Sequence, residues 1–92
     1  MCVLDLGIVD QSPIRQEGTA RQALQETVRI AQAAEDLGYH RYWVAEHHNS
    51  GGFAGTAPEI LIGQIASQTN RIIVGSGGVM LSHYSAFKVA ET

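Results

Sequence analysis

Four polar residues in a row, Glu46-His47-His48-Asn49, follow directly on the apolar segment Tyr42-Trp43-Val44-Ala45. An imidazole titrates near neutral pH, so a histidine here could act as a general acid or base, or could hold a proton by hydrogen bonding. Histidine with carboxylate is also a common metal ligand set. Neighbouring residues of an extended chain point to opposite sides, so His47 and His48 are not expected to face one cavity. We therefore expect one histidine to face a ligand and the other to pack against the wall.

A second candidate, Gly75-Ser76-Gly77-Gly78, ends another apolar segment. A phosphate-binding loop is one interpretation, but the GxGxxG order is missing and Val79-Met80-Leu81 follows in place of a helix start. Residues without side chains also let a flat ring lie directly on the main chain, and they permit unusual backbone geometry. We favour the planar ligand, with a simple bulge in the strand as the alternative.

These polar groups must be positioned by strands that alternate with helices. Continuous apolar runs predict strands, and amphipathic spacing predicts helices. The predicted order is strand 3–9, helix 19–37, strand 41–45, helix 56–68, strand 72–76 and a helix from about residue 86. This alternation predicts an α/β fold with a parallel sheet, whose chemistry lies at the carboxyl ends of the strands. His47, His48 and His83 then share one rim, and His40 lies on the opposite rim, where we expect a structural role.

Local signals support the two longer helices. Thr19 with Gln22, and Thr56 with Glu59, have the spacing of a capping box. Gly38 stands where a left-handed residue is expected to end the first helix. The side chains of Ala23, Thr27, Ala31, Ala34 and Leu37, among others, should form the inner face of that helix.

The predicted helices cannot cover both faces of the sheet. Helices on one side leave the other face bare, so we expect a further layer against the apolar strand residues Leu4, Leu6, Ile8, Val44, Ile73 and Val79. A (β/α)₈ barrel takes about 250 residues. We therefore interpret residues 1–92 as an N-terminal fragment of a single TIM (β/α)₈ barrel domain, with the barrel incomplete in this chain. A small complete α/β domain is the alternative.

Composition excludes several classes of protein. The net charge of −3 lacks the basic excess of a nucleic-acid binder, and no apolar run is long enough for a membrane span. A single cysteine, Cys2, provides neither an internal disulfide nor a paired metal motif. Asp5 stands where a signal peptide would be basic and then apolar. We expect a cytoplasmic protein without nucleic-acid or membrane partners.

The residues just described carry a resemblance. The runs from Gly38 to Asn49, Ala57-Pro58-Glu59 and Arg71 to Leu81, in this order and spacing, resemble the bacterial luciferase-like flavin-dependent monooxygenases. The resemblance covers essentially the whole chain. It implies the (β/α)₈ barrel, reduced FMN supplied by a separate flavin reductase, and molecular oxygen that forms a flavin peroxide and oxidises a small organic substrate. It also implies a homodimer formed through the early helices and no metal.

The resemblance assigns roles to particular residues. His47 would be the catalytic group beside the flavin, and Glu46 and Asn49 are candidates to orient it, although Glu46 could equally be a structural carboxylate. Ser76, Gly77 and Gly78 would bind the cofactor as the wall of the ring pocket, with a non-proline cis peptide at Gly77–Gly78. The residues that bind the cofactor phosphate come from later strands in this family, so the fragment alone is expected to bind flavin weakly or not at all and to be inactive.

Other functions stay open at this point. A branch of the family uses a deazaflavin for hydride transfer, which is the alternative to reduced FMN. The chain could instead be a non-catalytic luciferase-like subunit or an inactive truncated remnant. A metal-dependent hydrolase on the same barrel would use His47, His48 and His83. One departure from the family is Ser82, which stands where relatives often carry proline.

Overall fold

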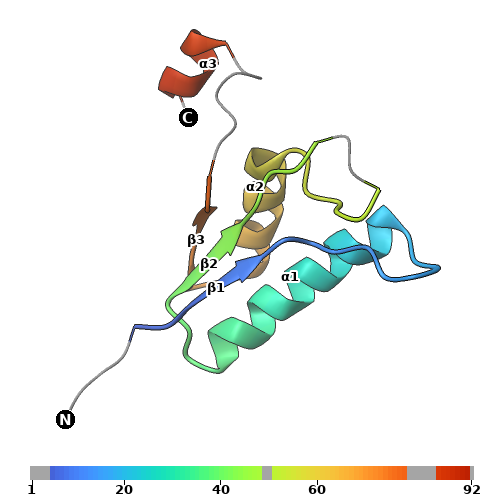
Figure 1. Cartoon of the computed structure of the whole chain (residues 1–92). Coiled ribbons are helices and arrows are strands. Elements are labelled where there is room, and N and C mark those ends of the chain that lie inside the picture. The colour runs from blue at the N-terminus through green and yellow to red at the C-terminus, as the bar shows by residue number, and fades with distance from the viewer. Residues whose placement is uncertain (1–4, 49–50, 79–84, 92) are drawn as a thin grey trace.

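A computed structural model describes residues 5–48, 51–78 and 85–91 (Figure 1). Its sheet has three parallel strands in the order β1 (Gly7–Asp10), β2 (Arg41–Val44) and β3 (Ile73–Ser76). The three strands are in register, and Val9, Trp43 and Gly75 lie side by side across the sheet. The predicted parallel α/β arrangement is confirmed. The first strand begins later than predicted, at Gly7, and residues 1–4 lie outside the described part.

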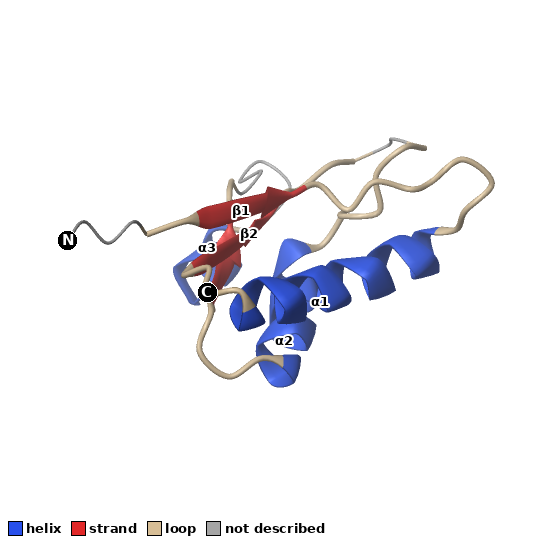
Figure 2. Ribbon diagram, turned by 90° about the horizontal axis from the view of Figure 1, so that it is seen from below, coloured by secondary structure: helices blue, strands red, loops and turns tan. Residues whose placement is uncertain are grey.

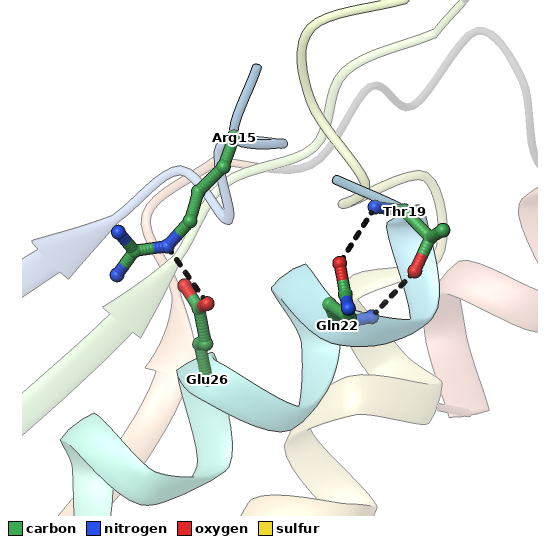
Figure 3. A network of polar contacts seen from close by, with 4 residues as sticks. All are labelled: Arg15, Thr19, Gln22 and Glu26. Atoms are coloured by element: carbon green, nitrogen blue, oxygen red, sulfur yellow. Dashed lines mark hydrogen bonds and ion pairs between the residues drawn. The ribbon is translucent and has the colours of Figure 1, made fainter. Parts of the chain in front are cut away.

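The first crossover helix, α1 (Ala20–Asp36), begins at the predicted capping box. The backbone N–H of Gln22 donates to Thr19 Oγ1 at 3.2 Å, and the N–H of Thr19 donates to Gln22 Oε1 at 3.0 Å (Figure 3). Gly38 has the expected left-handed conformation, with a φ of 90°. Leu37 caps the helix and is 78% exposed, so its predicted place on the inner face is wrong: it follows the last helical turn.

The second helix, α2 (Pro58–Gln68), differs from the prediction at its start. Its N-cap is Ala57, which makes no side-chain capping bond, and Pro58 occupies the first turn. Thr56 lies one residue too early to close a capping box. Proline suits this position because its fixed φ is helical and its missing N–H has no partner there anyway. The third helix, α3 (Ala86–Glu91), begins where predicted.

Helices α1 and α2 cover the same face of the sheet (Figure 2). The core between the layers is apolar, and its most buried members are Ala31, Ala34, Tyr42, Val44, Leu61, Ile65 and Ile72. Ile8 packs against this core, so the prediction that Ile8 and Val44 need a further layer is wrong. The bare face carries Val9, 65% exposed, and Ile73, 56% exposed. None of the helices in the described part is long and apolar enough to cross a membrane.

Glu35 joins the layers at the amino end of the sheet. Its carboxylate, near the end of α1, accepts backbone N–H groups from Asn70 (2.7 Å), Arg71 and Ile72 (2.9 Å). These hydrogen bonds, the one from Arg71 foremost, lower the pKa of Glu35. They fix the chain where it enters β3, and β3 in turn sets the position of the glycines that follow it.

Candidate functional site

The carboxyl ends of the three strands meet at one edge of the sheet, which we call the carboxyl edge. Residues 10–12 leave β1, residues 45–48 leave β2, and residues 76–78 leave β3. The strand pairing continues past the strand ends: the N–H of Ala45 donates to the Asp10 carbonyl at 3.2 Å, and that of Gly77 to the Val44 carbonyl at 2.8 Å. The predicted site residues His47, Ser76, Gly77 and Gly78 therefore all follow adjacent strands at this edge. Asn49, His83 and Tyr84 lie outside the described residues.

Glu46 and His48 pair with each other. His48 Nε2 lies 2.7 Å from Glu46 Oε2, and the Glu46 side chain is only 1% exposed. The prediction that Glu46 orients His47 is therefore not supported, because its carboxylate holds His48. Contact between residues two apart places both on one side of the extended chain, so His47 points to the other side. The two adjacent histidines have different surroundings, as the alternation along a strand predicts.

The imidazole of His47 stacks on an aromatic ring. Its centroid lies 4.5 Å from that of Phe53, with 24° between the ring planes. Among the residues that the structure describes, its Nε2 is the one buried side-chain nitrogen or oxygen without a hydrogen-bond partner. Burying such a group without a partner costs about 1–3 kcal/mol. Unsatisfied buried groups of this kind are rare in folded proteins, and a catalytic or binding role is one of the reasons why they occur.

The glycines in β3 and directly after it serve two different purposes. A Cβ on Gly75 would lie 2.0 Å from Trp43 Cζ3, so this position must be glycine for the indole to fit against β3. Gly77 and Gly78 are exposed, and a Cβ on Gly78 would meet no described atom within 4 Å. The last two glycines thus leave a stretch of main chain open. The described residues contain no cis peptide bond, so the predicted cis bond at Gly77–Gly78 is wrong.

Ser76 turns back on this open main chain. Its Oγ donates to the Gly78 carbonyl and also accepts the Gly78 N–H at 3.3 Å. A serine hydroxyl that bonds main chain two residues away stabilises a local turn. Ser76 therefore shapes the path of the two glycines.

A buried polar network lies beneath the ends of β1 and β2. The Tyr42 hydroxyl donates to Asp10 Oδ2, and Asp10 Oδ1 accepts the N–H of Ser12 at 2.7 Å. The hydroxyls of Ser12 and Thr27 lie 2.8 Å apart. Burial, and then the hydrogen bond to Asp10, raise the pKa of the Tyr42 phenol above its ordinary value. The network ties both strands to α1 below the carboxyl edge.

Sequence reasoning missed Phe53 and Tyr42. Phe53 is the one aromatic residue in the segment Gly51-Gly52-Phe53-Ala54-Gly55, and a large ring among small residues is a usable signal for a contact. Tyr42 looked like an ordinary strand residue, and only the three-dimensional partner Asp10 reveals its role. No group of three or more potential metal ligands occurs within residues 5–48, 51–78 and 85–91.

Comparison with known proteins decides the family. The family model of the luciferase-like monooxygenases matches residues 4–92. The chain belongs to the luciferase-like monooxygenase family. It is 56% identical to the N-acetyl-S-alkylcysteine monooxygenase of Bacillus subtilis, over 97% of this chain and 27% of that protein. It is 45% identical to a luciferase-like monooxygenase of Escherichia coli K12, over 91% of this chain and 25% of that protein.

Two solved structures share the fold. Apo-MsnO8 superposes with a TM-score of 0.91 at 49% identity, over 97% of this chain and 27% of the other. The oxygenating constituent of 3,6-diketocamphane monooxygenase from Pseudomonas putida, a type II Baeyer–Villiger monooxygenase in complex with FMN, gives 0.87 at 25% identity, over 96% and 24%. The expected family and fold are confirmed. The chain spans about a quarter of the length of these relatives, so it holds an incomplete barrel.

Proposed function

We propose that this chain forms the first part of a flavin-dependent monooxygenase that uses reduced FMN and molecular oxygen to oxidise a small organic substrate. The Nε2 of His47 at the carboxyl edge, buried and without a hydrogen-bond partner among the described residues, carries the proposal. A ligand atom that hydrogen-bonds to this nitrogen would remove the cost of leaving it unsatisfied. The FMN complex of the Pseudomonas relative, which superposes over nearly the whole chain, supports flavin as that ligand.

The residues present fit a flavin ring. Gly77 and Gly78 offer an exposed stretch of main chain without side chains, which allows a flat heterocycle to approach closely. Ser76 stabilises the turn that presents this stretch. We propose that these three residues form the wall of the ring pocket, next to the strand that ends in His47.

His47 is proposed as the catalytic residue. Reduced FMN would supply the electrons that molecular oxygen accepts. The imidazole would hold or move a proton at Nε2, a task that histidine side chains commonly perform in enzymes. Its ring stacks on Phe53, and a fixed ring orientation is what efficient proton transfer requires. Glu46 and His48 bond to each other and are assigned no catalytic role.

The test is anaerobic titration of reduced FMN into the complete protein as its gene encodes it, followed by mixing with oxygen. We expect binding in the micromolar range and slow return of oxidised FMN. His47→Ala should speed that return roughly tenfold, because it removes a hydrogen bond from Nε2 to the bound ligand, which is worth about 1–2 kcal/mol. His40→Ala is the matched control: His40 is an exposed histidine at the opposite edge, 3.5 Å from Asp5. No binding of reduced FMN at micromolar concentration would defeat the proposal, and binding of a deazaflavin alone would replace the cofactor.

The proposal also names a partner enzyme and a cellular compartment. A separate flavin reductase would supply the reduced FMN, and the enzyme would work in the cytoplasm. A reductase partner can be tested by coupling: when an added reductase generates the reduced FMN, the return of oxidised FMN should be slower with the wild type than with His47→Ala. Substrate remains a small organic molecule of open identity, because its pocket would be built largely by other parts of the barrel.

We also propose a homodimer formed through α1 and α2. A groove of about 960 Å³ runs between these helices, and Ile60 in it is 73% exposed. Apolar and amide side chains form most of the groove and suit a second copy of the chain; they include Leu24, Gln25, Val28, Gln32, Ala57, Ile60, Gln64 and Gln68. Ile60→Arg should convert the dimer to a monomer in light scattering. Leu37→Arg, equally exposed but outside the groove, should not.

A further inference from the structure

Phe53 is the one large side chain among the small residues that flank it. It is flanked by two glycines on one side and by Ala54 and Gly55 on the other, yet its ring stacks on His47 at 4.5 Å. The Nε2 atom of His47 makes no hydrogen bond within the described residues. Within the described residues, the stack on Phe53 therefore positions this imidazole, and no hydrogen bond at Nε2 does so.

Two loops hold Phe53 in place. Pro13 and Phe53 form an antiparallel bridge. The Ile14 N–H donates to the Gly52 carbonyl and the Ala54 N–H donates to the Ser12 carbonyl, both at 2.9 Å. We call this pairing of residues 12–14 with residues 52–54 the clasp. It joins the loop after β1 to the loop before α2, directly beside the carboxyl edge.

The clasp is anchored in the buried polar network. Ser12, 2% exposed, is fixed by Asp10 and by the hydroxyl of Thr27. Ser12 also adopts a φ of 51°, a left-handed conformation that a non-glycine residue adopts only at a cost. Such a conformation persists where its surroundings determine it, and it is concentrated at functional sites. The network thus fixes one strand of the clasp, and the clasp fixes Phe53.

The loop also approaches β2 closely on its other side. The N–H of His47 donates to the Gly55 carbonyl at 2.7 Å. A Cβ on Gly55 would lie 2.8 Å from the Ala45 carbonyl oxygen, so only glycine permits this approach. The same loop therefore binds the backbone of His47 through Gly55 and its side chain through Phe53, which sets the ring in both position and tilt.

We propose that Phe53 is a positioning residue for His47. Its ring, held by the clasp, fixes the imidazole so that Nε2 stays buried and free for the bound ligand. The inference rests on the proposed function only in taking that ligand to be reduced flavin. An aliphatic side chain could fill the same volume, but it lacks the flat face and the quadrupole that orient a stacked ring.

The first experiment measures the ring directly and needs no cofactor. The complete protein is labelled at histidine ring carbons, and the His47 signal is assigned by its loss in His47→Gln. We expect the His47 ring protons to show a ring-current shift that disappears in Phe53→Leu and returns in Phe53→Tyr. Gln11→Ala, an exposed change in the loop after β1, should leave the signal unchanged. An unaltered His47 signal in Phe53→Leu overturns the inference, whatever the protein binds.

The second experiment asks whether the position matters for function. Phe53→Leu should speed the return of oxidised FMN roughly tenfold, because displacing a positioned group by about 1 Å can change a rate by up to 10²-fold. The Kd for reduced FMN should change less than the rate, and Phe53→Tyr should restore both. A lost ring-current shift with an unaltered rate also overturns the inference, since the contact would then be structural only. Failure of the wild type to bind FMN is a separate result that defeats the proposed function. Should Phe53→Leu not fold, Phe53→Met provides the same two measurements.

Discussion

The two edges of the sheet use their polar groups in opposite ways. At the amino edge, Glu35 accepts three backbone N–H groups. The N–H of His40 donates to the Leu6 carbonyl, just before β1, and the His40 carbonyl accepts the N–H of Ile73 in β3, both at 2.9 Å. At the carboxyl edge, the Nε2 of His47 is buried without a partner and Gly78 is open. The polar groups named at the amino edge all have partners, whereas at the carboxyl edge the Nε2 of His47 has none among the described residues and is left for a ligand to satisfy.

This difference separates stability from function within one small sheet. In parallel α/β barrels, residues at the carboxyl end serve chemistry and those at the amino end serve stability. The chain is consistent with that division at the level of single hydrogen bonds. Substitutions at the amino edge should therefore change unfolding without changing ligand binding, and substitutions at the carboxyl edge should do the reverse.

The largest effect is expected from Glu35→Gln. An amide cannot accept the three N–H groups as well as a carboxylate does, because charge-assisted hydrogen bonds are about twice as strong as neutral ones. We expect the largest fall in melting temperature among the variants described here, with the Kd for reduced FMN unchanged. An FMN affinity that falls in the folded variant would contradict the division between the edges.

The pH dependence of the same variant sharpens this prediction. The folded-state pKa of Glu35 is lowered from its ordinary value of 4.5. The stabilisation is therefore fully present above that value and is lost as the pH falls towards the folded-state pKa. The difference in melting temperature between wild type and Glu35→Gln should be largest at neutral pH and should shrink in acid. A difference that stays constant down to strong acid would rule out the carboxylate as its source.

Tyr42→Phe tests the network that supports the carboxyl edge from below. Removing the hydroxyl leaves the buried Asp10 without this donor and should lower the free energy of unfolding by about 1–3 kcal/mol. Because the Tyr42 pKa is raised above 10.0, the unfolded chain loses the phenol proton first. The advantage of wild type over Tyr42→Phe should therefore be constant below about pH 10 and decline above it. Urea unfolding at pH 8 and pH 10.5 provides the measurement, and equal stability of the two proteins at pH 8 would contradict it.

The sequence was enough to predict the elements and poor at predicting which groups touch. Apolar runs and the Thr19 capping box located the strands and the first helix because these signals are local. The start of α2 was misplaced because Thr56 and Glu59 imitate a capping box one residue away from the real N-cap. Partners such as Phe53 for His47 depend on two loops meeting in space, and no local pattern encodes that meeting. The order of the elements was enough to place His47 and Gly77 at one edge. That Gly75 makes room for the Trp43 ring could be seen only in the structure.

The same glycine-to-alanine change should affect stability at Gly75, within β3, and FMN binding at Gly78, in the loop after it. Gly75→Ala drives a methyl group into the Trp43 ring and should cost about 1–3 kcal/mol of stability, the usual range for overpacking. Gly78→Ala meets no described atom within 4 Å, so stability should change by less than about 0.5 kcal/mol. The same methyl group would stand on the proposed ring pocket and should weaken FMN binding roughly tenfold. Calorimetry and an FMN titration on each variant separate the two effects. An FMN affinity that is unchanged in Gly78→Ala would show that Gly78 does not line the ring pocket.

The smallest effects are expected in the segment that leads from the clasp into α1. Thr19→Ala removes an N-cap and should cost about 1 kcal/mol. Arg15 pairs with Glu26 at 2.8 Å nearby, as Figure 3 shows, but the arginine is 77% exposed. An exposed ion pair contributes at most about 1 kcal/mol and is screened by salt, so Arg15→Ala should cost less than Thr19→Ala. Adding 0.5 M salt should erase the small Arg15 effect and preserve the Thr19 effect, because the cap is a hydrogen bond between neutral groups. Equal losses of stability in the two variants, with the same salt dependence, would contradict this ranking of the cap above the ion pair.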